Sequence, residues 1–300
     1  MKILLLGKNG QLGWELQRSL APLGELVTLD RHGTDLCGDL ANLQGLAETV
    51  RRVRPNVIVN AAAYTAVDKA ESEPELARTL NALAPGVLAQ EAAALGALLV
   101  HYSTDYVFDG SGTRPWLETD TPAPLNVYGQ TKLDGERLIQ VVCPNHLIFR
   151  TSWVYAARGS NFAKTMLRLA QERESLRVID DQFGAPTGAD LLADVTAHCI
   201  RQVLRSPTDA GLYHLAAGGE INWFGYAKYA ITQSERLFNA IKVVACKVEP
   251  VASSAFPTPA RRPHNSRLDT RRLQATFGFN LPHWQPGVAR MLDEVFGHGP

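Results

Sequence analysis

The stretch Ile3-Leu4-Leu5-Leu6-Gly7-Lys8-Asn9-Gly10-Gln11-Leu12-Gly13 decides the fold class. Its first four residues are all apolar, which is typical of a strand buried on both faces of a parallel sheet. Glycines then recur at positions 7, 10 and 13, and apolar residues follow at helical spacing from Trp14 to Leu23. A strand, a glycine turn and a helix in this order predict a dinucleotide site, with Gly7, Gly10 and Gly13 bringing the backbone close to a pyrophosphate.

Further apolar runs extend this unit into a doubly wound parallel sheet. Strands are predicted at residues 25–29, 57–59, 98–102 and 146–150. Helices are predicted at 42–54, at 75–95 as one helix or two, and then at 161–172, 189–204 and 223–239. The later part is looser, with short strands near 176–179 and 212–215. We predict a Rossmann-type α/β fold: residues 1–150 bind NAD(P), and residues 151–300 mainly form a smaller C-terminal α/β substrate-binding domain, with some later segments returning to the sheet.

Asp30 and Arg31 end the second predicted strand and bear on the choice of cofactor. A carboxylate at this point can accept hydrogen bonds from an adenosine ribose, whereas a guanidinium can hold a 2′-phosphate. The two residues favour opposite cofactors, so we expect both NADPH and NADH to be used. Asp39 lies in a loop expected to pass the adenine edge. An ordinary solvated turn residue is an equally good interpretation of Asp39.

Tyr128 and Lys132 form a Tyr-x-x-x-Lys motif. On a helix these side chains lie one turn apart on one face, where an ammonium favours the phenolate. We therefore expect Lys132 to depress the pKa of Tyr128 toward neutrality and Tyr128 to act as a proton donor. Thr104 follows the fourth predicted strand, and its hydroxyl can reach the same crevice, although strand threonines are commonly only β-formers.

Composition excludes several classes of function. Thirty basic residues balance thirty acidic residues among 300, so no overall field attracts nucleic acid or an anionic membrane. The N-terminal apolar run is too short for a signal peptide, and no stretch approaches the length of a membrane span. Four cysteines are widely spaced without a metal-binding pattern, which suggests a reducing compartment and a cytoplasmic protein.

Four motifs occur in the order found in the extended short-chain dehydrogenase/reductase superfamily, which the chain resembles. They are the glycine turn, Asn60-Ala61-Ala62-Ala63, Ser103-Thr104 and Tyr-x-x-x-Lys. Longer segments resemble the dTDP-4-dehydrorhamnose reductase family. They are residues 103–108, 126–129, 149–155, 181–187 and 261–266.

This resemblance implies reduction of the C4 keto group of dTDP-4-dehydro-β-L-rhamnose by NADPH or NADH, giving dTDP-L-rhamnose for cell-surface polysaccharide of the O-antigen type. The implied cofactor-binding residues are Gly10, Gln11, Leu12, Asp30, Asp39, Leu40, Ala63, Tyr64, Thr65 and Tyr102. Lys132 would anchor the nicotinamide ribose, and Tyr128 would protonate the sugar oxygen. The implied substrate-binding residues are Thr104, Asp105, Tyr128, Trp153, Gln182, Arg261 and Arg262.

Family members can form a homodimer around Mg²⁺, here implied at Glu15, Asp190 and Glu294, although Asp190 is shorter than the glutamate expected. Two alternatives stay open. One is a sister nucleotide-sugar enzyme, an epimerase or dehydratase, but dehydratases need a glutamate where Tyr106 follows Asp105. The other is a non-catalytic NADP-binding protein resembling the regulatory subunit of methionine adenosyltransferase.

Overall fold

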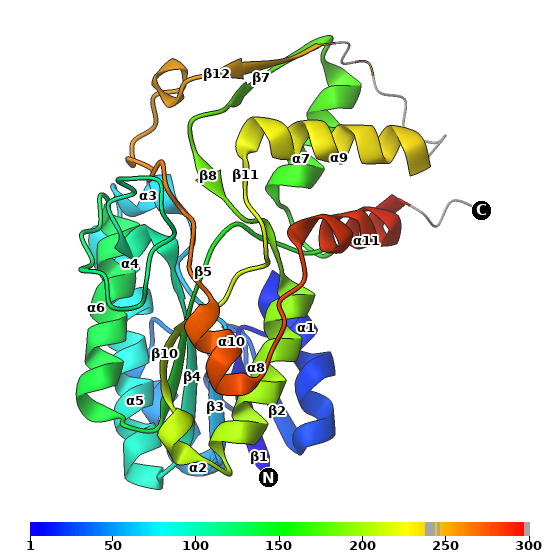
Figure 1. Ribbon diagram of the computed structural model, residues 1–300. Coiled ribbons are helices and arrows are strands. Elements are labelled where there is room, and N and C mark those ends of the chain that lie inside the picture. Colours follow the sequence, from blue (N-terminus) through cyan, green and yellow to red (C-terminus); the bar gives the residue numbers. More distant parts are fainter. Residues whose placement is uncertain (238–243, 245–246, 297–300) are drawn as a thin grey trace.

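A computed structural model of the chain describes residues 1–237, 244 and 247–296 (Figure 1). Its centre is a parallel sheet of six strands in the order β10-β5-β4-β3-β1-β2. The strands are β1 Lys2–Leu6, β2 Glu25–Leu29, β3 Val57–Asn60, β4 Leu98–Thr104, β5 His146–Thr151 and β10 Gly211–His214. The predicted fold class, a doubly wound Rossmann-type sheet, is confirmed. The strand order reverses between β1 and β3, where open α/β sheets bind their ligands.

Alternate strand residues build a core on each face of the sheet. Ile3 and Leu5 pack with the helices on one face, whereas Leu4 and Leu6 pack with those on the other. The first face carries α1 Gln11–Leu20, α8 Ala189–Val203 and α10 Arg271–Phe277. The second face carries α2 Leu43–Val53, α5 Ala84–Leu95 and α6 Val127–Val142. Burial on both faces explains why these strands are wholly apolar.

The remaining second-half elements lie beyond the carboxyl ends of the sheet strands, at the top of Figure 1. Their helices, α7 Phe162–Glu172, α9 Trp223–Leu237 and α11 Trp284–Phe296, share a core of their own that includes Leu167, Tyr226 and Trp284. Three strand pairs accompany them. These are β7 Ser175–Ile179 with β12 Lys247–Val251, β8 Phe183–Gly184 with β11 Ile221–Asn222, and β6 Val154–Tyr155 with β9 Thr187–Gly188. Thus β10, α8 and α10 belong to the sheet layers although they lie late in the chain.

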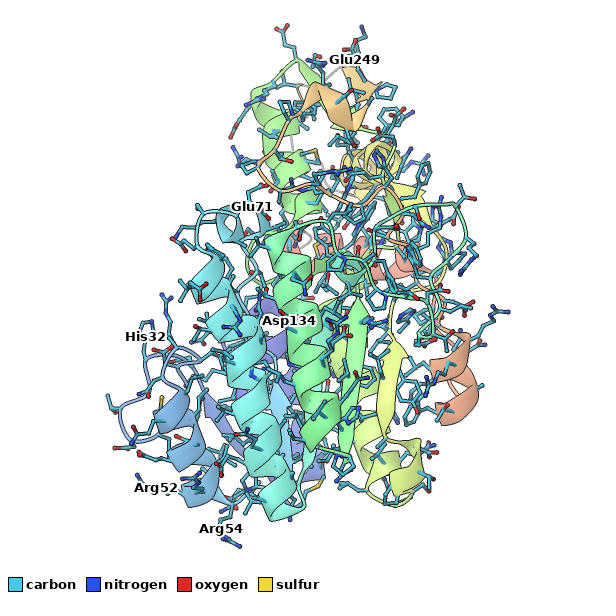
Figure 2. The ribbon with its side chains drawn as sticks, turned by 90° about the vertical axis from the view of Figure 1, so that its left-hand side faces the viewer. His32, Arg52, Arg54, Glu71, Asp134 and Glu249 are labelled. Carbon is cyan, nitrogen blue, oxygen red and sulfur yellow. The ribbon has the colours of Figure 1, made fainter. Side chains whose placement is uncertain are left out.

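The segment predicted as one helix or two, residues 75–95, is divided. It comprises α4 Pro74–Arg78, a π-helical segment Thr79–Leu83, and α5, and it is preceded by the short helix α3 Val67–Ala70. Pro85 has no N–H to donate one turn back to the Asn81 carbonyl, which explains why the regular helical pattern is interrupted there. Helices α5 and α6 pack together on the face shown in Figure 2.

Other predicted elements agree with the structure to within a few residues. Asn42 and Asn161 are the N-caps of α2 and α7, and each side chain accepts a hydrogen bond from a backbone N–H in the first turn. The helix predicted at 223–239 is described as far as Leu237, and Asn239 lies outside the described residues. Helices α10 and α11 and strand β12 were not predicted from the sequence. Within the described ranges, no helix is both long enough and apolar enough to cross a bilayer.

Candidate active site

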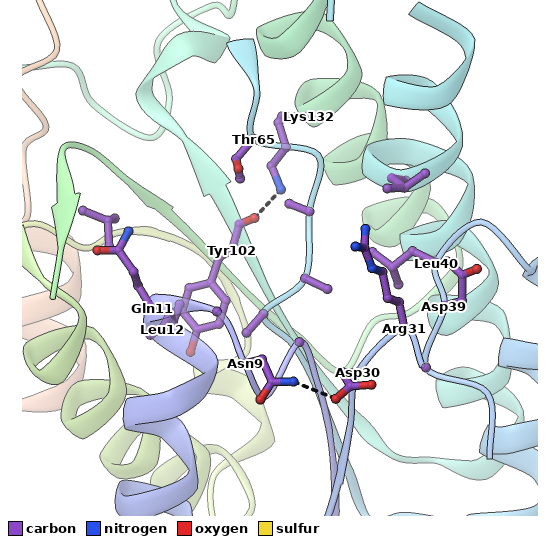
Figure 3. A pocket seen from close by; sticks show the side chains of 18 of the residues that line it. Asn9, Gln11, Leu12, Asp30, Arg31, Asp39, Leu40, Thr65, Tyr102 and Lys132 are labelled. Atoms are coloured by element: carbon purple, nitrogen blue, oxygen red, sulfur yellow. Dashed lines mark hydrogen bonds between the residues drawn. The ribbon is translucent and has the colours of Figure 1, made fainter. Parts of the chain in front are cut away.

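A cavity of about 620 Å³ lies at the carboxyl ends of β1, β2, β3 and β4 (Figure 3). Most of the residues predicted to bind the cofactor line it. They are Gly7, Gly10, Gln11, Leu12, Asp30, Arg31, Asp39, Leu40, Ala63, Thr65, Tyr102, Tyr128 and Lys132. Two others, Gly13 and Tyr64, are not in its wall. The Tyr64 phenol instead donates a hydrogen bond of 2.7 Å to the Glu73 carboxylate.

The glycine turn fits the phosphates of a dinucleotide. Gly7 has a φ of +86°, and a Cβ at this position would lie 2.8 Å from the Ala62 nitrogen. A Cβ at Gly13 would lie 2.0 Å from the Gly7 carbonyl oxygen, so Gly13 permits the close helix–turn contact without touching the cavity. Helix α1 begins after Gly10, with no side chain capping its first N–H groups. These N–H groups are therefore open to an anion in the cavity.

Asp30 follows the carboxyl end of β2 in the cavity wall and is held as a carboxylate. It accepts hydrogen bonds from the His32 backbone N–H at 2.8 Å and from the Asn9 side chain at 2.7 Å (Figure 3). The His32 N–H holds the pKa of Asp30 below its ordinary value, and nearby Lys8 acts in the same direction. Arg31 and His32 line the same end, and the Arg31 Nε donates to His32 Nε2 at 3.0 Å. A carboxylate and a guanidinium thus both face the expected position of the adenosine ribose.

Helix α6 positions Tyr128 and Lys132. The N-cap is Asn126, whose side chain accepts a hydrogen bond from the Gly129 N–H at 2.8 Å. Tyr128 therefore stands in the first turn and Lys132 one turn later, and both side chains line the cavity. Lys132 is only 2% exposed, and its Nζ donates to the Tyr102 carbonyl at 2.5 Å (Figure 3).

The expected depression of the Tyr128 pKa toward neutrality is wrong for this structure. Burial raises the pKa of Tyr128 to about 12, while the Thr104 hydroxyl lowers it and the Asp105 charge raises it. Burial also lowers the pKa of Lys132 to about 8, against the effect of Glu136. Desolvation favours the neutral forms of both groups and outweighs the mutual attraction expected from helix spacing. Tyr128 is therefore a phenol that keeps its proton.

Thr104 and Asp105 stand at the end of β4 beside Tyr128. The Thr104 hydroxyl donates to Asp105 Oδ1 at 3.1 Å and accepts from the Tyr106 N–H at 3.2 Å. Asp105 is 2% exposed, and burial raises its pKa to about 7 although the Thr104 and Ser266 hydroxyls lower it. Its Oδ2 has no hydrogen-bond partner in the described part of the chain.

Trp153 and Gln182 are joined through Trp223. Trp153 has a φ of +50°, and its ring stacks on the Trp223 ring with centroids 3.5 Å apart. The Trp223 indole N–H donates to Gln182 Oε1 at 3.1 Å, and the Gln182 amide donates to the Ser253 hydroxyl at 2.9 Å. Neither side chain lines the dinucleotide cavity. Trp223 was not foreseen, because nothing in the sequence indicated its contact with a residue 70 positions earlier.

A second cavity of about 500 Å³ contains Gln182, Arg261 and Arg262 in its wall. Arg262 is already engaged there. Its Nη2 lies 2.7 Å from Asp68 Oδ2, and its Nη1 donates to the Thr258 hydroxyl at 2.7 Å. The two arginines predicted to act together therefore differ in their contacts, because the Arg262 side chain ties residues 258–262 to α3 of the first half.

The predicted Mg²⁺ site is not supported. Glu15, Asp190 and Glu294 do border one cavity of about 260 Å³. However, Arg18 lies 3.8 Å from Glu15, and Arg290 lies 3.6 Å from Asp190, so two of the three carboxylates already have a guanidinium group beside them. Among the residues that the structure describes, no group of three acidic, histidine or cysteine side chains is arranged to hold a metal ion.

Known proteins resemble the chain over nearly its full length. Residues 1–296 match a family model described as the RmlD substrate binding domain. The chain is 60% identical over 296 residues to the dTDP-4-dehydrorhamnose reductase of Escherichia coli strain K12, covering 99% of this chain and 98% of that protein. It is 46% identical to the dTDP-4-dehydrorhamnose reductase of Burkholderia thailandensis, with 98% and 99% covered.

Solved structures agree with these matches. The dTDP-4-dehydrorhamnose reductase of Bacillus anthracis in complex with NADP has a TM-score of 0.88 and 35% identity, with 98% of this chain and 99% of that chain covered. The UDP-glucose 4-epimerase of Thermus thermophilus in complex with NAD has a TM-score of 0.82 over all of both chains, but its 18% identity shows only a shared fold.

Proposed function

The chain belongs to the dTDP-4-dehydrorhamnose reductase family, and from this premise we propose that it reduces the C4 keto group of dTDP-4-dehydro-β-L-rhamnose to give dTDP-L-rhamnose, the last step of dTDP-rhamnose synthesis. The observation that carries the proposal is the placement of Tyr128 and Lys132 in the wall of the dinucleotide cavity, in a chain 60% identical to the Escherichia coli reductase. The comparisons give no support to a non-catalytic regulatory subunit.

The glycine turn and the Asp30–Arg31 pair would hold NADPH or NADH, which supplies the hydride that reduces the carbonyl carbon. Tyr128 donates its proton to the carbonyl oxygen as negative charge develops there. A phenol whose pKa is raised to about 12 suits this role, since it stays protonated until the oxygen becomes basic. Thr104, whose hydroxyl interacts with the Tyr128 phenol, would turn its proton from Asp105 toward the same oxygen and donate a second hydrogen bond to it. Lys132 binds the nicotinamide ribose and compensates the charge left on Tyr128.

Elements beyond the carboxyl ends of the sheet would bind the sugar nucleotide. From the family resemblance we assign Asp105 and Trp153 to the sugar. We assign Gln182 to the nucleoside and Arg261 to the diphosphate, because the second cavity brings an exposed guanidinium near a buried amide. Arg262 has a second role, since its pair with Asp68 fixes the segment that carries Arg261. From the family resemblance we also propose a homodimer and a product destined for cell-surface polysaccharide of the O-antigen type.

The decisive experiment measures NAD(P)H oxidation by the purified protein with dTDP-4-dehydro-β-L-rhamnose. Wild type should consume either cofactor, and Tyr128→Phe should lower kcat by about 10²–10⁴-fold while keeping cofactor affinity. Tyr106→Phe is a matched control, since this half-buried phenol packs edge-on against Tyr128 with ring centroids 5.7 Å apart. It should change kcat much less than Tyr128→Phe.

Near-native turnover by Tyr128→Phe would show that another group donates the proton. If the wild type consumed neither cofactor with this keto sugar, the reductase proposal would give way to the regulatory-subunit interpretation.

A further inference from the structure

Asn60 and His101 lie beneath Lys132 as a cross-strand pair. They are register partners on β3 and β4, and each is only 1% exposed. Ile58 and Leu99, two residues earlier on the same strands, pack in the core beneath α2, α5 and α6. Because side chains two apart on a strand share a face, Asn60 and His101 point toward α6. The mechanism proposed above leaves both residues without a role.

The hydrogen bonds of Asn60 fix the position of the proton on His101. Asn60 Oδ1 accepts from the Ala62 backbone N–H at 3.2 Å, so the amide nitrogen is the atom that faces His101 Nδ1, also at 3.2 Å. An amide N–H₂ only donates, and Nδ1 must therefore accept. Burial and the nearby Lys132 hold the pKa of His101 well below its ordinary value, so the ring is neutral. Its single proton then resides on Nε2.

This tautomer places an N–H opposite the Lys132 amine. His101 Nε2 lies 3.3 Å from Lys132 Nζ, while Nζ donates to the Tyr102 carbonyl. An ammonium has three donors and no acceptor, so it gains nothing from an opposing N–H. A neutral amine has a lone pair that can accept this N–H. The Asn60–His101 pair directs an N–H donor at the Lys132 amine and therefore favours the uncharged form of Lys132.

We propose that Asn60 and His101 are positioning residues for the reduction, which act through Lys132 by setting how readily its amine takes up a proton. The inference rests on the proposed function, because Lys132 must be an ammonium to compensate the charge left on Tyr128. Protonating Lys132 would require His101 to move its proton to Nδ1, against the Asn60 amide. Asn60 could accept a hydrogen bond from Nδ1 only if its Oδ1 gave up the hydrogen bond from the Ala62 N–H.

The other ionisable groups near Lys132 do not fix an N–H donor opposite its amine. On α6 itself, Tyr128 is a neutral phenol, and Glu136 raises the pKa of Lys132. The Glu136 carboxylate is shared with Arg150 of β5, whose Nη2 lies 2.6 Å away, and with the Ser103 hydroxyl of β4. His101 is the titratable side chain of β4 that contacts Nζ, and its partner from β3 is the uncharged Asn60.

The first test is ¹⁵N NMR of histidine-labelled protein without cofactor or substrate, with the His101 signals assigned by their loss in His101→Gln. The expected result is a neutral imidazole protonated on Nε2 at about pH 9, above the pKa of Lys132. Asn60→Asp, which can still accept from Ala62 N–H but offers His101 a second acceptor, should move the proton to Nδ1. A wild-type His101 protonated on Nδ1 at that pH would overturn the proposal. This outcome is independent of whether any sugar is reduced.

The second test is the pH dependence of kcat/KM. Activity should fall as pH rises through the pKa of Lys132, near 8. Asn60→Leu removes the amide without adding charge and should move this basic limb upward by about one pH unit. Asn81→Leu is the matched control, since Asn81 is another fully buried amide, bonded to the Tyr64 backbone rather than to His101, and should leave the limb in place. An unmoved limb in folded Asn60→Leu would refute the proposal, and if that variant does not fold, the wild-type NMR decides.

Discussion

Asp105→Asn should make the protein more stable at pH 8 while weakening its function. Burial raises the pKa of Asp105 from its ordinary value of 3.8 to about 7, so the folded chain holds this proton long after the unfolded chain has lost it. Stability then falls as pH rises from about 4 to about 7, because the unfolded state binds fewer protons over that range. Asparagine resembles the protonated carboxyl in shape and cannot ionise, so the variant does not lose stability as pH rises through this range.

The magnitude follows from the two pKa values, 3.8 and about 7. At about 1.36 kcal/mol for each pH unit between them, ionising Asp105 costs the folded state at most about 4 kcal/mol. The unpartnered Oδ2 is consistent with such a cost, because a buried carboxylate oxygen without a donor is not compensated for the loss of water. We expect Asp105→Asn to exceed wild type by about 2–4 kcal/mol at pH 8 and to match it near pH 4.

Urea unfolding of both proteins at several values between pH 4 and pH 8.5 measures this difference directly. The gap should open between pH 4 and pH 7 and then stay constant. The same variant should bind the keto sugar less well, since Asp105 is assigned to the sugar site, which would make it a stability–function trade-off. A gap that does not change with pH, or a variant less stable than wild type at pH 8, would refute the reasoning.

Three further predictions concern recognition. Arg31→Ala should weaken NADPH about tenfold and NADH much less, as measured by fluorescence titration, because only NADPH carries the 2′-phosphate that a guanidinium can bind; equal effects on both would show that Arg31 points away from that phosphate. Arg261→Ala should raise KM for the keto sugar about tenfold with little change in kcat, the pattern of a remote diphosphate contact. Arg262→Ala should act like Asp68→Asn, since both break the same ion pair; a larger loss of substrate affinity in Arg262→Ala alone would mean that Arg262 also contacts the diphosphate.

The cavity that we assign to the cofactor was predictable because its determinants are local in sequence. The apolar run of β1, the glycines at 7, 10 and 13, and the start of α1 follow one another within a few residues. Parallel-sheet topology then brings the ends of β1, β2, β3 and β4 to one edge. Strand burial on both faces also leaves little ambiguity in where these strands lie.

The substrate side depended on contacts that no local pattern encodes. Arg262 pairs with Asp68, 194 residues earlier, and Trp153 stacks on Trp223. The pairing of β7 with β12 joins segments separated by α8 and α9, and β12 contains Pro250, which local propensity disfavours in a strand. The Asn60–His101 contact depends on strand register, which only the folded sheet fixes.

Burial, rather than neighbouring charge, sets the protonation states at the reacting centre. Tyr128, Lys132 and Asp105 are all shifted toward their neutral forms, and burial is the largest cause for each. The sequence-based expectation failed because it treated the Tyr128–Lys132 pair as if it were solvated, where charge attraction would dominate. In the proposed reaction, charge that develops on the sugar oxygen in this dry site would be relieved by moving a proton from Tyr128, and the phenolate would in turn stabilise the ammonium form of Lys132. The readiness of Lys132 to take up a proton therefore becomes a property that the enzyme can adjust, and the Asn60–His101 pair is placed where that adjustment can be made.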